Sequence, residues 1–139
     1  MATIYLAGPI NQDGSNPYAW HETVQDHSPE IDWINPFVLH NHNGDEVWDH
    51  IDEIIEQDLQ EIRDADAVLL RRIDEYNLCG ASIEAREAHT HGIPVIIWND
   101  AETDIPLFLR GHADEVYETM EEAIEAVKAA VLETKTTDF

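Results

Sequence analysis

The sequence predicts an α/β fold: a single domain built on a doubly wound sheet of about five parallel strands, with helices on both faces. Two observations support this prediction. Short apolar runs alternate along the chain with longer segments of helical periodicity. The apolar runs are continuous, which is typical of strands that are covered on both faces. Because crossovers between parallel strands are right-handed, helices are expected on both sides of the sheet.

The first half of the chain contains two expected strands, at residues 3–7 and 31–35, and two expected helices, at residues 17–26 and 47–64. Each strand is a short apolar run that ends at a proline-containing turn. An Asn-Pro pair, which is typical of a helix start, introduces the first helix. In the second helix the apolar residues recur at spacings of three to five, which predicts an amphipathic helix.

The second half continues this alternation with three apolar runs and three helical segments. The expected elements are strands at 67–70, 93–98 and 115–117, and helices at 80–91, 105–109 and 120–132. A polar tail is expected from about residue 133. Because no linker or internal repeat divides the chain, residues 1–139 are interpreted as one domain.

The loops that follow the strands are the expected ligand-binding segments. In open parallel sheets, ligands bind beyond the carboxyl ends of the strands, near the point where the strand order reverses. The loops at that edge are residues 8–17, 36–46, 71–80 and 99–104.

Acidic residues outnumber basic residues by 30 to 7, which gives a formal net charge of −23 over 139 residues. A field of this sign repels phosphate backbones and anionic lipids, which argues against duplex nucleic acid or a membrane surface as the main partner. Lysine is also scarce, being present only as Lys128 and Lys135. The composition resembles that of proteins from salt-in halophiles, and an ordinary acidic cytosolic protein is the alternative.

Several classes of site and location are disfavoured by what the sequence lacks. Cys79 is the only cysteine, so an internal disulfide and a zinc site of several thiolates are excluded, and we interpret Cys79 as a small buried residue. The start of the chain lacks the pattern of a signal peptide, and no apolar run is long enough to span a bilayer, so a cytoplasmic protein is expected. Neither a Walker loop nor a Gly-x-Gly-x-x-Gly follows the first strand.

The histidines do not form a convincing metal site. They lie in polar segments or on helix faces without a carboxylate at ligand spacing, so we interpret them as solvated and expect no metal and no cofactor. The residues concerned are His40, His42, His50, His89 and His91.

Two carboxylates are candidates for chemistry. Asp58 points within about 20° of the centre of the apolar stripe of its helix, toward the core or a cleft, with a structural hydrogen bond as the alternative. Glu84 lies near the start of the helix at residues 80–91, where a helix N-terminus favours an ionised carboxylate; the alternative is an ordinary acidic residue of a first turn. Gly80 would let a substrate approach the backbone closely. One ionised carboxylate and one in an apolar setting suit cleavage of a glycosidic bond.

Three segments occur in the order and spacing of one known family. They are Ile4-Tyr5-Leu6-Ala7-Gly8-Pro9; Glu56-Gln57-Asp58-Leu59 through Ala65-Asp66-Ala67-Val68; and Gly80-Ala81-Ser82-Ile83-Glu84 through Ala88 and Gly92-Ile93-Pro94-Val95. The chain resembles the nucleoside 2-deoxyribosyltransferase family, including its small phage-encoded members and its 2'-deoxynucleoside 5'-monophosphate N-glycosidase relatives. The resemblance covers roughly residues 3–98 and implies a flavodoxin-like fold.

This resemblance implies a role for each matching residue. Glu84 would attack C1' of a 2'-deoxynucleoside, Asp58 would orient or protonate the leaving base, and Tyr5 would steady Glu84. Gly8 and Pro9 would line the sugar pocket. Water or a free nucleobase would then resolve the deoxyribosyl-enzyme ester, which gives hydrolysis or transfer. The resemblance also implies a homo-oligomer, a dimer or larger.

Two positions depart from the family pattern. Many transferases carry an Asp six residues before the Glu, where this chain has Leu78, with Asn77 beside it as a substitute for binding the sugar hydroxyl. The small residue often found two places after the Glu is replaced by a basic one, which could reach a 5'-phosphate or a neighbouring subunit. Candidates for a phosphate contact are Ser82, Arg86, Asn11 and Ser15.

The sequence is also compatible with two other functions. A nucleotide-binding or sensing module could keep the same pocket without turnover, and the absence of an acid at Leu78 favours it. A metal-dependent hydrolase that uses the loop histidines is a third hypothesis. The preferred base, the choice between nucleoside and 5'-monophosphate, and the choice between transfer and hydrolysis do not follow from the sequence.

Overall fold

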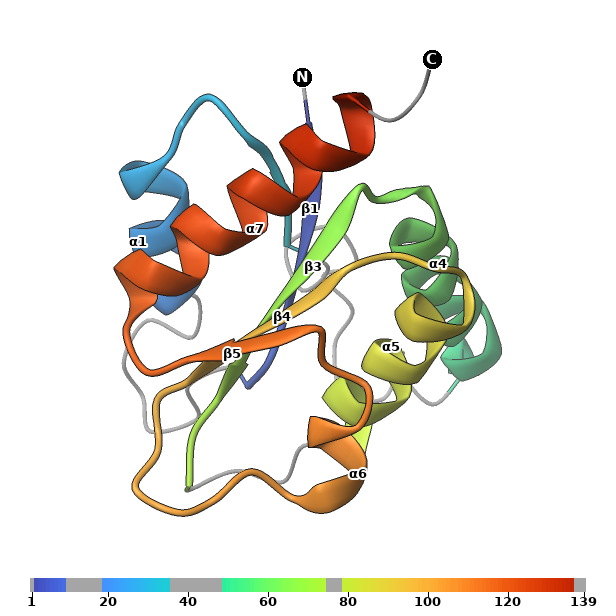
Figure 1. Cartoon of the computed structure of the whole chain (residues 1–139). Helices are drawn as coiled ribbons and strands as arrows, with labels where there is room; N and C mark the ends of the chain where they lie inside the picture. Colours follow the sequence, from blue (N-terminus) through green and yellow to red (C-terminus); the bar gives the residue numbers. More distant parts are fainter. Residues whose placement is uncertain (1, 10–18, 36–48, 75–78, 137–139) are drawn as a thin grey trace.

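The computed structural model describes residues 2–9, 19–35, 49–74 and 79–136, with side chains described as far as residue 132. One sheet of five parallel strands has the order β2-β1-β3-β4-β5 (Figure 1), which confirms the predicted doubly wound α/β fold. The strands are β1 Thr3–Ala7, β2 Asp32–Ile34, β3 Ala67–Arg72, β4 Val95–Asn99 and β5 Glu115–Tyr117. The helices are α1 Ala19–His27, α4 Ile51–Asp64, α5 Cys79–Thr90, α6 Leu107–Arg110 and α7 Met120–Thr136.

The strands form one continuous ladder. Tyr5 pairs with Val68, Val68 pairs with Val95, and Ile97 pairs with Val116. Nearly every residue of β1 and β3 is buried, as the continuous apolar runs predict for strands covered on both faces.

Helices cover both faces of the sheet (Figure 1). On one face α1 and α7 pack on a core that includes Ile4, Leu69 and Ile124. On the other face α4, α5 and α6 pack on a second core, which includes Tyr5 and Leu70. Each aliphatic side chain that is fully buried contributes about 1.5–3 kcal/mol relative to an exposed one.

Two strand boundaries differ from the prediction for reasons of hydrogen bonding. β4 begins at Val95 instead of residue 93, because Pro94 has no N–H to donate; its carbonyl accepts a bond of 2.9 Å from the Val68 amide. β3 continues to Arg72, where a loop was expected from residue 71, because Arg71 and Arg72 pair with the last residues of β4.

Three helix boundaries also differ. α5 begins one residue early at Cys79, and α6 is displaced by about two residues to Leu107–Arg110. α7 continues to Thr136, four residues beyond the expected helix end at residue 132. Polar residues extend a helix on its solvent side when no Gly or Pro intervenes. The expected starts at residues 17 and 47 lie outside the described residues.

The strand order places a reversal between β1 and β3. The chain passes from β1 to β2 on one side of this point and from β3 to β4 on the other, so the carboxyl ends of β1 and β3 flank the position at which open parallel sheets bind ligands. Of the helices in the described part of the chain, none is both long and apolar enough to cross a membrane.

Candidate active site

Tyr5 and Glu84 meet beside this reversal point. Tyr5 lies in β1 with its side chain toward α5, and its hydroxyl donates a hydrogen bond to Glu84 Oε2. The inward face of α5 carries Ala81, Ala85 and Ala88, all buried. Because these side chains are small, α5 approaches the sheet closely enough for Glu84 to reach the strand.

Two further carboxylates face this pair from α4. Asp58 and Glu61 lie one helical turn apart, so their side chains leave α4 on the same side. Both are partly buried, and Oδ1 of Asp58 and Oε2 of Glu61 are shielded from solvent. Both groups also act electrostatically on Tyr5 and Glu84. We refer to Tyr5, Asp58, Glu61 and Glu84 as the carboxylate cluster.

An ion pair holds α4 beside α5. Arg63 Nη1 lies 2.8 Å from Oε1 of Glu87, which is one turn beyond Glu84, and Arg63 Nη2 lies 2.6 Å from Oε1 of Glu56. These contacts hold the pKa of the Arg63 guanidinium above its usual value. The guanidinium thus bridges the two helices that carry the three carboxylates of the cluster.

The electrostatics of Glu84 differ from the sequence expectation. Burial raises the pKa of Glu84 to about 8; the Tyr5 hydrogen bond opposes this rise, and the negative charges of Asp58 and Glu61 favour it. Glu84 lies in the second turn of α5, too far from the helix start for the N-terminal dipole to dominate. Burial and the neighbouring negative charges thus favour the protonated form of Glu84 in the ligand-free site, opposite to the effect expected of the helix N-terminus.

The same surroundings act on the tyrosine. The pKa of the Tyr5 hydroxyl lies far above its usual value, chiefly because the group is buried and also because of the negative charge of Glu84. Tyr5 therefore stays protonated and remains a hydrogen-bond donor to Glu84.

The Gly8-Pro9 turn is fixed at the carboxyl end of β1. Gly8 has φ +141°, and a Cβ there would lie 2.8 Å from the Arg71 carbonyl oxygen and 3.1 Å from Trp20 Cζ2. Trp20 Nε1 donates a hydrogen bond of 2.7 Å to the Pro9 carbonyl. Only glycine fits at residue 8, and the turn is held from α1 and from β3.

Arg71 connects this turn to the last part of β4. Its guanidinium lies 4.8 Å from the Trp98 ring centre and 5.8 Å from that of Trp20, and Nη2 lies 2.6 Å from Asp100 Oδ2. On the same face, His21 is fully buried, and its pKa is lowered to about 4 by burial and by the charge of Arg71.

Arg72 fixes the loop that follows β4. It is buried, with Nη1 at 3.0 Å from Asn99 Oδ1 and 2.7 Å from the Thr103 carbonyl, and Nη2 at 2.7 Å from Thr103 Oγ1. Asp74 accepts hydrogen bonds from the Thr103 hydroxyl and from the Glu102 amide. These contacts tie the ends of β3 and β4 together beside the cluster.

The other expected substrate-binding residues are not all gathered with the cluster. Among the residues that the structure describes, none places an atom within 4 Å of a Cβ on Gly80, so they leave the first turn of α5 open there. Ser82 is partly buried, but it lies two residues from Glu84 and so leaves the helix on a different side. Arg86 is exposed, with Nη1 3.4 Å from His112 Nε2. Asn77, like Leu78, lies outside the described residues.

The sequence did not predict several residues of this region, and the interpretation of Cys79 as a buried residue was wrong. The spacing of three residues from Asp58 places Glu61 on the same side of the helix, but this spacing is not distinctive in a chain with 30 acidic residues. Trp20, Arg71 and Arg72 act through tertiary contacts that no local pattern predicts. Cys79 is exposed, not buried, because it begins α5 at the edge of the fold.

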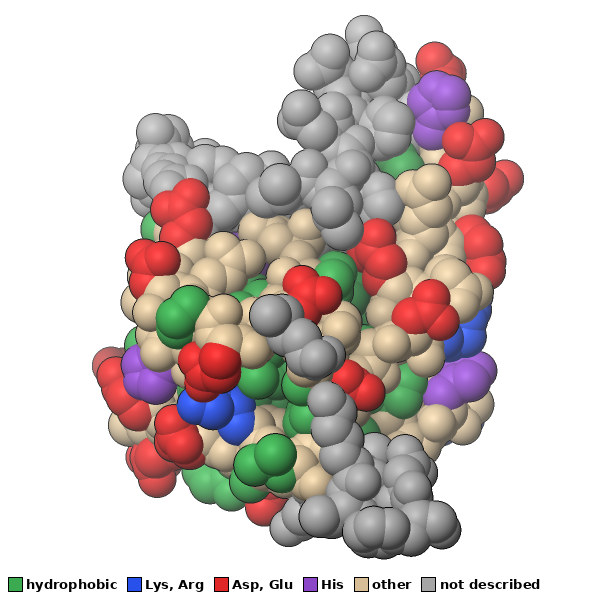
Figure 2. All heavy atoms as spheres, turned by 90° about the horizontal axis from the view of Figure 1, so that it is seen from above, with side chains coloured by type: hydrophobic (Ala, Val, Ile, Leu, Met, Phe, Trp, Pro, Cys, Tyr) green, Lys and Arg blue, Asp and Glu red, His purple; other side chains and the backbone are tan. Residues whose placement is uncertain are grey.

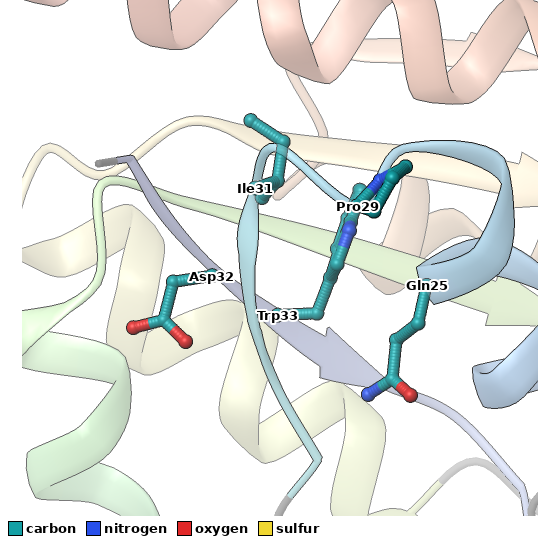
Figure 3. Close-up of a pocket in the computed structure, with 5 residues that line it drawn as sticks. All are labelled: Gln25, Pro29, Ile31, Asp32 and Trp33. Carbon is teal, nitrogen blue, oxygen red and sulfur yellow. The ribbon is translucent and has the colours of Figure 1, made fainter.

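A hollow of about 240 Å³ lies elsewhere (Figure 3). It lies between the end of α1 and the edge strand β2, and Gln25, Pro29, Ile31, Asp32 and Trp33 line it. Trp33 Nε1 donates a hydrogen bond of 2.8 Å to the Ser28 carbonyl, so it is not available as a donor to a ligand in this hollow. The lining residues include none of the cluster. Among the described residues, no group of three His, Cys, Asp or Glu side chains could hold a metal ion.

Fold and site together define an α/β domain with buried carboxylates at a topological switch point, suited to acid–base and nucleophilic chemistry. No protein-family model matches the sequence, and no curated protein sequence matches it.

Solved structures share the fold over nearly the whole chain. The 2-deoxyribosyltransferase of Bacillus psychrosaccharolyticus is 20% identical with a TM-score of 0.77, and the match covers 94% of this chain and 96% of that one. A conserved protein of Enterococcus faecalis V583 is 19% identical (TM-score 0.74, covering 93% and 98%). The 2-desoxiribosyltransferase of Leishmania mexicana is 16% identical (TM-score 0.67, covering 91% and 96%). At these identities the similarity establishes the fold.

Proposed function

We propose that this protein cleaves the N-glycosidic bond of 2'-deoxynucleosides or their 5'-monophosphates and transfers deoxyribose to another base or to water. The observation that carries the proposal is the hydrogen bond from Tyr5 to Glu84, made at the switch point with Asp58 opposite. The resemblance in sequence and the shared fold of two 2-deoxyribosyltransferases point to the same chemistry.

In the proposed reaction Glu84 attacks C1' through an oxocarbenium-like transition state. The C1'–N bond breaks, its electron pair goes to the base, and a proton supplied through Asp58 neutralises the base as it leaves. The product is a deoxyribosyl ester of Glu84. Water then hydrolyses the ester, or a second base attacks C1' and regenerates the carboxylic acid. Tyr5 holds the Glu84 carboxylate in place by its hydrogen bond.

The remaining candidates would shape the pocket. Gly8 and Pro9 form a turn fixed on two sides, which suits a rigid wall for the sugar. Gly80 leaves open space at the start of α5, where a ligand can approach the backbone. Asn77 is proposed for the sugar hydroxyl in place of the acid that the family carries at Leu78. Nothing in the reaction requires a metal or a cofactor.

A 5'-phosphate would have to reach Ser82 and Arg86, which lie four residues apart on the same side of α5. Because this side differs from that of Glu84, a 5'-monophosphate would have to contact two sides of α5 at once, whereas a nucleoside would not. The comparison of each nucleoside with its 5'-monophosphate therefore belongs in the first assay.

A homo-oligomer, a dimer or larger, is also proposed. Three large apolar side chains are exposed on the neighbouring helices α5 and α6: Ile83 at 56%, Leu107 at 81% and Phe108 at 83%. Arg86 and His112 lie in contact beside them. A second copy that covered these side chains would remove apolar surface from water next to Glu84. Sedimentation in about 3 M KCl tests this, with Phe108→Ser as the variant expected to shift the protein toward monomer.

The test of function is chromatographic detection of free base from a panel of 2'-deoxynucleosides and their 5'-monophosphates, in high KCl, with and without an acceptor base. Wild type is compared with Glu84→Ala and Glu84→Gln. The matched control is Glu53→Gln, the same kind of change at an exposed position of α4. Base release is expected from wild type and the control, and only background from the Glu84 variants. The lanes with acceptor separate transfer from hydrolysis.

The alternative, a nucleotide-binding or sensing module without turnover, makes a different prediction. It is favoured by the raised pKa of Glu84, since a carboxyl that carries a proton at neutral pH is a poor nucleophile. Folded wild type that releases no base from any substrate, yet unfolds at a higher temperature when a nucleoside or nucleotide is added, would overturn the proposed activity in favour of this module.

A further inference from the structure

Glu61 is the member of the carboxylate cluster to which neither the proposed reaction nor the sequence pattern gives a role. It lies one turn beyond Asp58 on α4, with Oε2 shielded from solvent, and it acts electrostatically on both Tyr5 and Glu84. The charged groups that act on Glu84 are Asp58 and Glu61, both acidic. Three carboxyl groups from two adjoining helices thus face one buried tyrosine hydroxyl.

Gathering three carboxyl groups in a partly buried site disfavours the state in which all three are ionised. Bringing like charges together in a buried site raises the affinity for the first proton, which then belongs to the group as a whole. The raised pKa of Glu84, about 8, agrees with a site that holds one such proton in its ligand-free state. The buried Tyr5 hydroxyl keeps its own proton and cannot supply this one.

The proposed half-reaction consumes one proton. A carboxylic acid and a deoxynucleoside give an ester and a free base: the C1'–O bond forms, the C1'–N bond breaks, and the proton of the acid ends on the base. A site that enters the reaction with one proton among its carboxyl groups therefore needs none from solvent. In the second half-reaction water or a neutral acceptor base bonds to C1', the ester C1'–O bond breaks, and the proton that the acceptor loses returns to the carboxyl groups.

We infer that Glu61 is a positioning residue that, together with Asp58 and Glu84, retains the single proton that the leaving base takes. This inference rests on the proposed function, because it assigns the source of that reaction's proton. Glu61 acts through the other two carboxyl groups, and its negative charge makes loss of the shared proton less favourable. In the ligand-free protein Glu61 thereby sets the upper end of the pH range in which the three carboxyl groups hold this proton.

The variant Glu61→Gln removes one negative charge and keeps the shape of the side chain. The remaining pair then binds the proton less tightly, so the site loses it at lower pH. We expect the alkaline limb of the kcat/KM profile to move down by about one pH unit, a tenfold change in proton affinity. Glu61→Asp keeps the charge, so its profile is expected to stay close to that of wild type. Glu53→Gln, with the same change at an exposed position of α4, is the matched control.

Two measurements are made on each variant. The first is the pH dependence of kcat/KM for base release, which reports groups of the free enzyme. The second needs no activity: a carbon-13 NMR titration of protein labelled at the Glu side-chain carboxyl carbon, with the Glu84 signal assigned by its loss in Glu84→Gln. Circular dichroism at each pH establishes that the variants are folded.

The outcomes distinguish this inference from the proposed function. If both the alkaline limb and the Glu84 titration midpoint fall in Glu61→Gln but not in Glu53→Gln, the inference holds. If wild type releases base and neither quantity moves, the inference is wrong and the proposed function stands. If no protein releases base, the proposed function fails and the NMR titration midpoint of Glu84 alone tests the role of Glu61. A midpoint that does not move in Glu61→Gln overturns that role. A lowered midpoint supports the part of the inference in which Glu61 makes the site bind the proton more tightly. If Glu61→Gln is unfolded, a midpoint in Glu61→Asp that differs from wild type by a unit or more overturns the inference.

Discussion

At the scale of single residues, Glu84 makes the stability of the fold depend on pH. Its pKa is raised to about 8, whereas an exposed glutamate titrates near 4.5. The folded state therefore binds the proton more tightly than the unfolded state does, and this contribution to stability is complete below about pH 4.5 and is lost as pH rises through about 8. The buried Glu84 carboxyl thus contributes less to the stability of the fold at neutral and alkaline pH than at acid pH.

Glu84→Gln is predicted to remove this loss. Gln cannot ionise and still accepts from the Tyr5 hydroxyl, so the difference in unfolding free energy between variant and wild type should grow from pH 5 to 9. At about 1.4 kcal/mol per pKa unit it should reach a few kcal/mol in favour of the variant. Thermal unfolding in high KCl measures this difference, with Glu121→Gln, at an exposed position of α7, as the control. A constant difference across the range would contradict the raised pKa.

The two glycines of the candidate site give opposite predictions. Gly8→Ala places a Cβ 2.8 Å from the Arg71 carbonyl at φ +141°, which should reduce the unfolding free energy by about 3 kcal/mol. Gly80→Ala meets no atom within 4 Å and lies in a helix, so stability should stay equal or rise by at most about 1 kcal/mol. Urea unfolding in high KCl compares the two. Equal effects would mean that the Gly8-Pro9 turn is not held as described.

The sequence identifies some of the candidate site and not the rest. The direction of Asp58 within its helix and the position of Glu84 after a strand and loop follow from periodicity, because both depend on local geometry. Tyr5 enters only through the family resemblance, since a tyrosine in an apolar strand looks like any other core residue. The pKa of Glu84 depends on how closely α4 and α5 approach the sheet, which no local pattern contains.

At the scale of elements, Arg72 joins the ends of β3 and β4. Its guanidinium donates hydrogen bonds to Asn99 and Thr103, and Nη2 lies 3.8 Å from Asp74 Oδ1. Replacement by Met removes all of these contacts from the buried end of β3. Arg72→Met should therefore reduce the unfolding free energy by about 3 kcal/mol, whereas Arg86→Met, at an exposed position, should change it by less than about 0.5 kcal/mol. Urea titration of both variants checks this, and a small effect at Arg72 would show that the loop is held by other contacts.

The elements themselves follow well from the sequence, and their ends less well. Continuous apolar runs locate the three central strands β1, β3 and β4, because strands covered on both faces require them. The edge strands β2 and β5 are short and include the exposed acidic residues Asp32 and Glu115. The ends depend on pairing instead: β3 continues through Arg71 and Arg72 because β4 offers partners, although two arginines read alone suggest a loop. The order β2-β1-β3-β4-β5 is a property of the whole chain, and the sequence predicts only that such a sheet exists.

At the scale of the whole molecule, charge is the dominant feature. The formal net charge is −23, and in Figure 2 acidic side chains are spread over the side at which the strands begin, with few basic groups among them. Several basic residues are already paired, as Lys128 is with Glu30 at 2.7 Å and Arg71 with Asp100 at 2.6 Å. Most carboxylates therefore repel one another without a compensating cation from the protein.

Salt should accordingly stabilise the fold by screening this repulsion. The Debye length is about 10 Å at 0.1 M and about 3 Å at 1 M, so neighbouring surface carboxylates interact strongly at low salt and weakly at high salt. We predict that the fold loosens as KCl falls below about 1 M, which circular dichroism and thermal unfolding between about 0.1 M and 3 M KCl would detect. The double variant Glu118→Gln, Glu121→Gln, at exposed positions, should need less KCl than wild type for the same melting temperature. A spectrum and melting temperature that do not change over this range would mean that the acidic surface is tolerated without screening, and the halophilic interpretation of the composition would then be wrong.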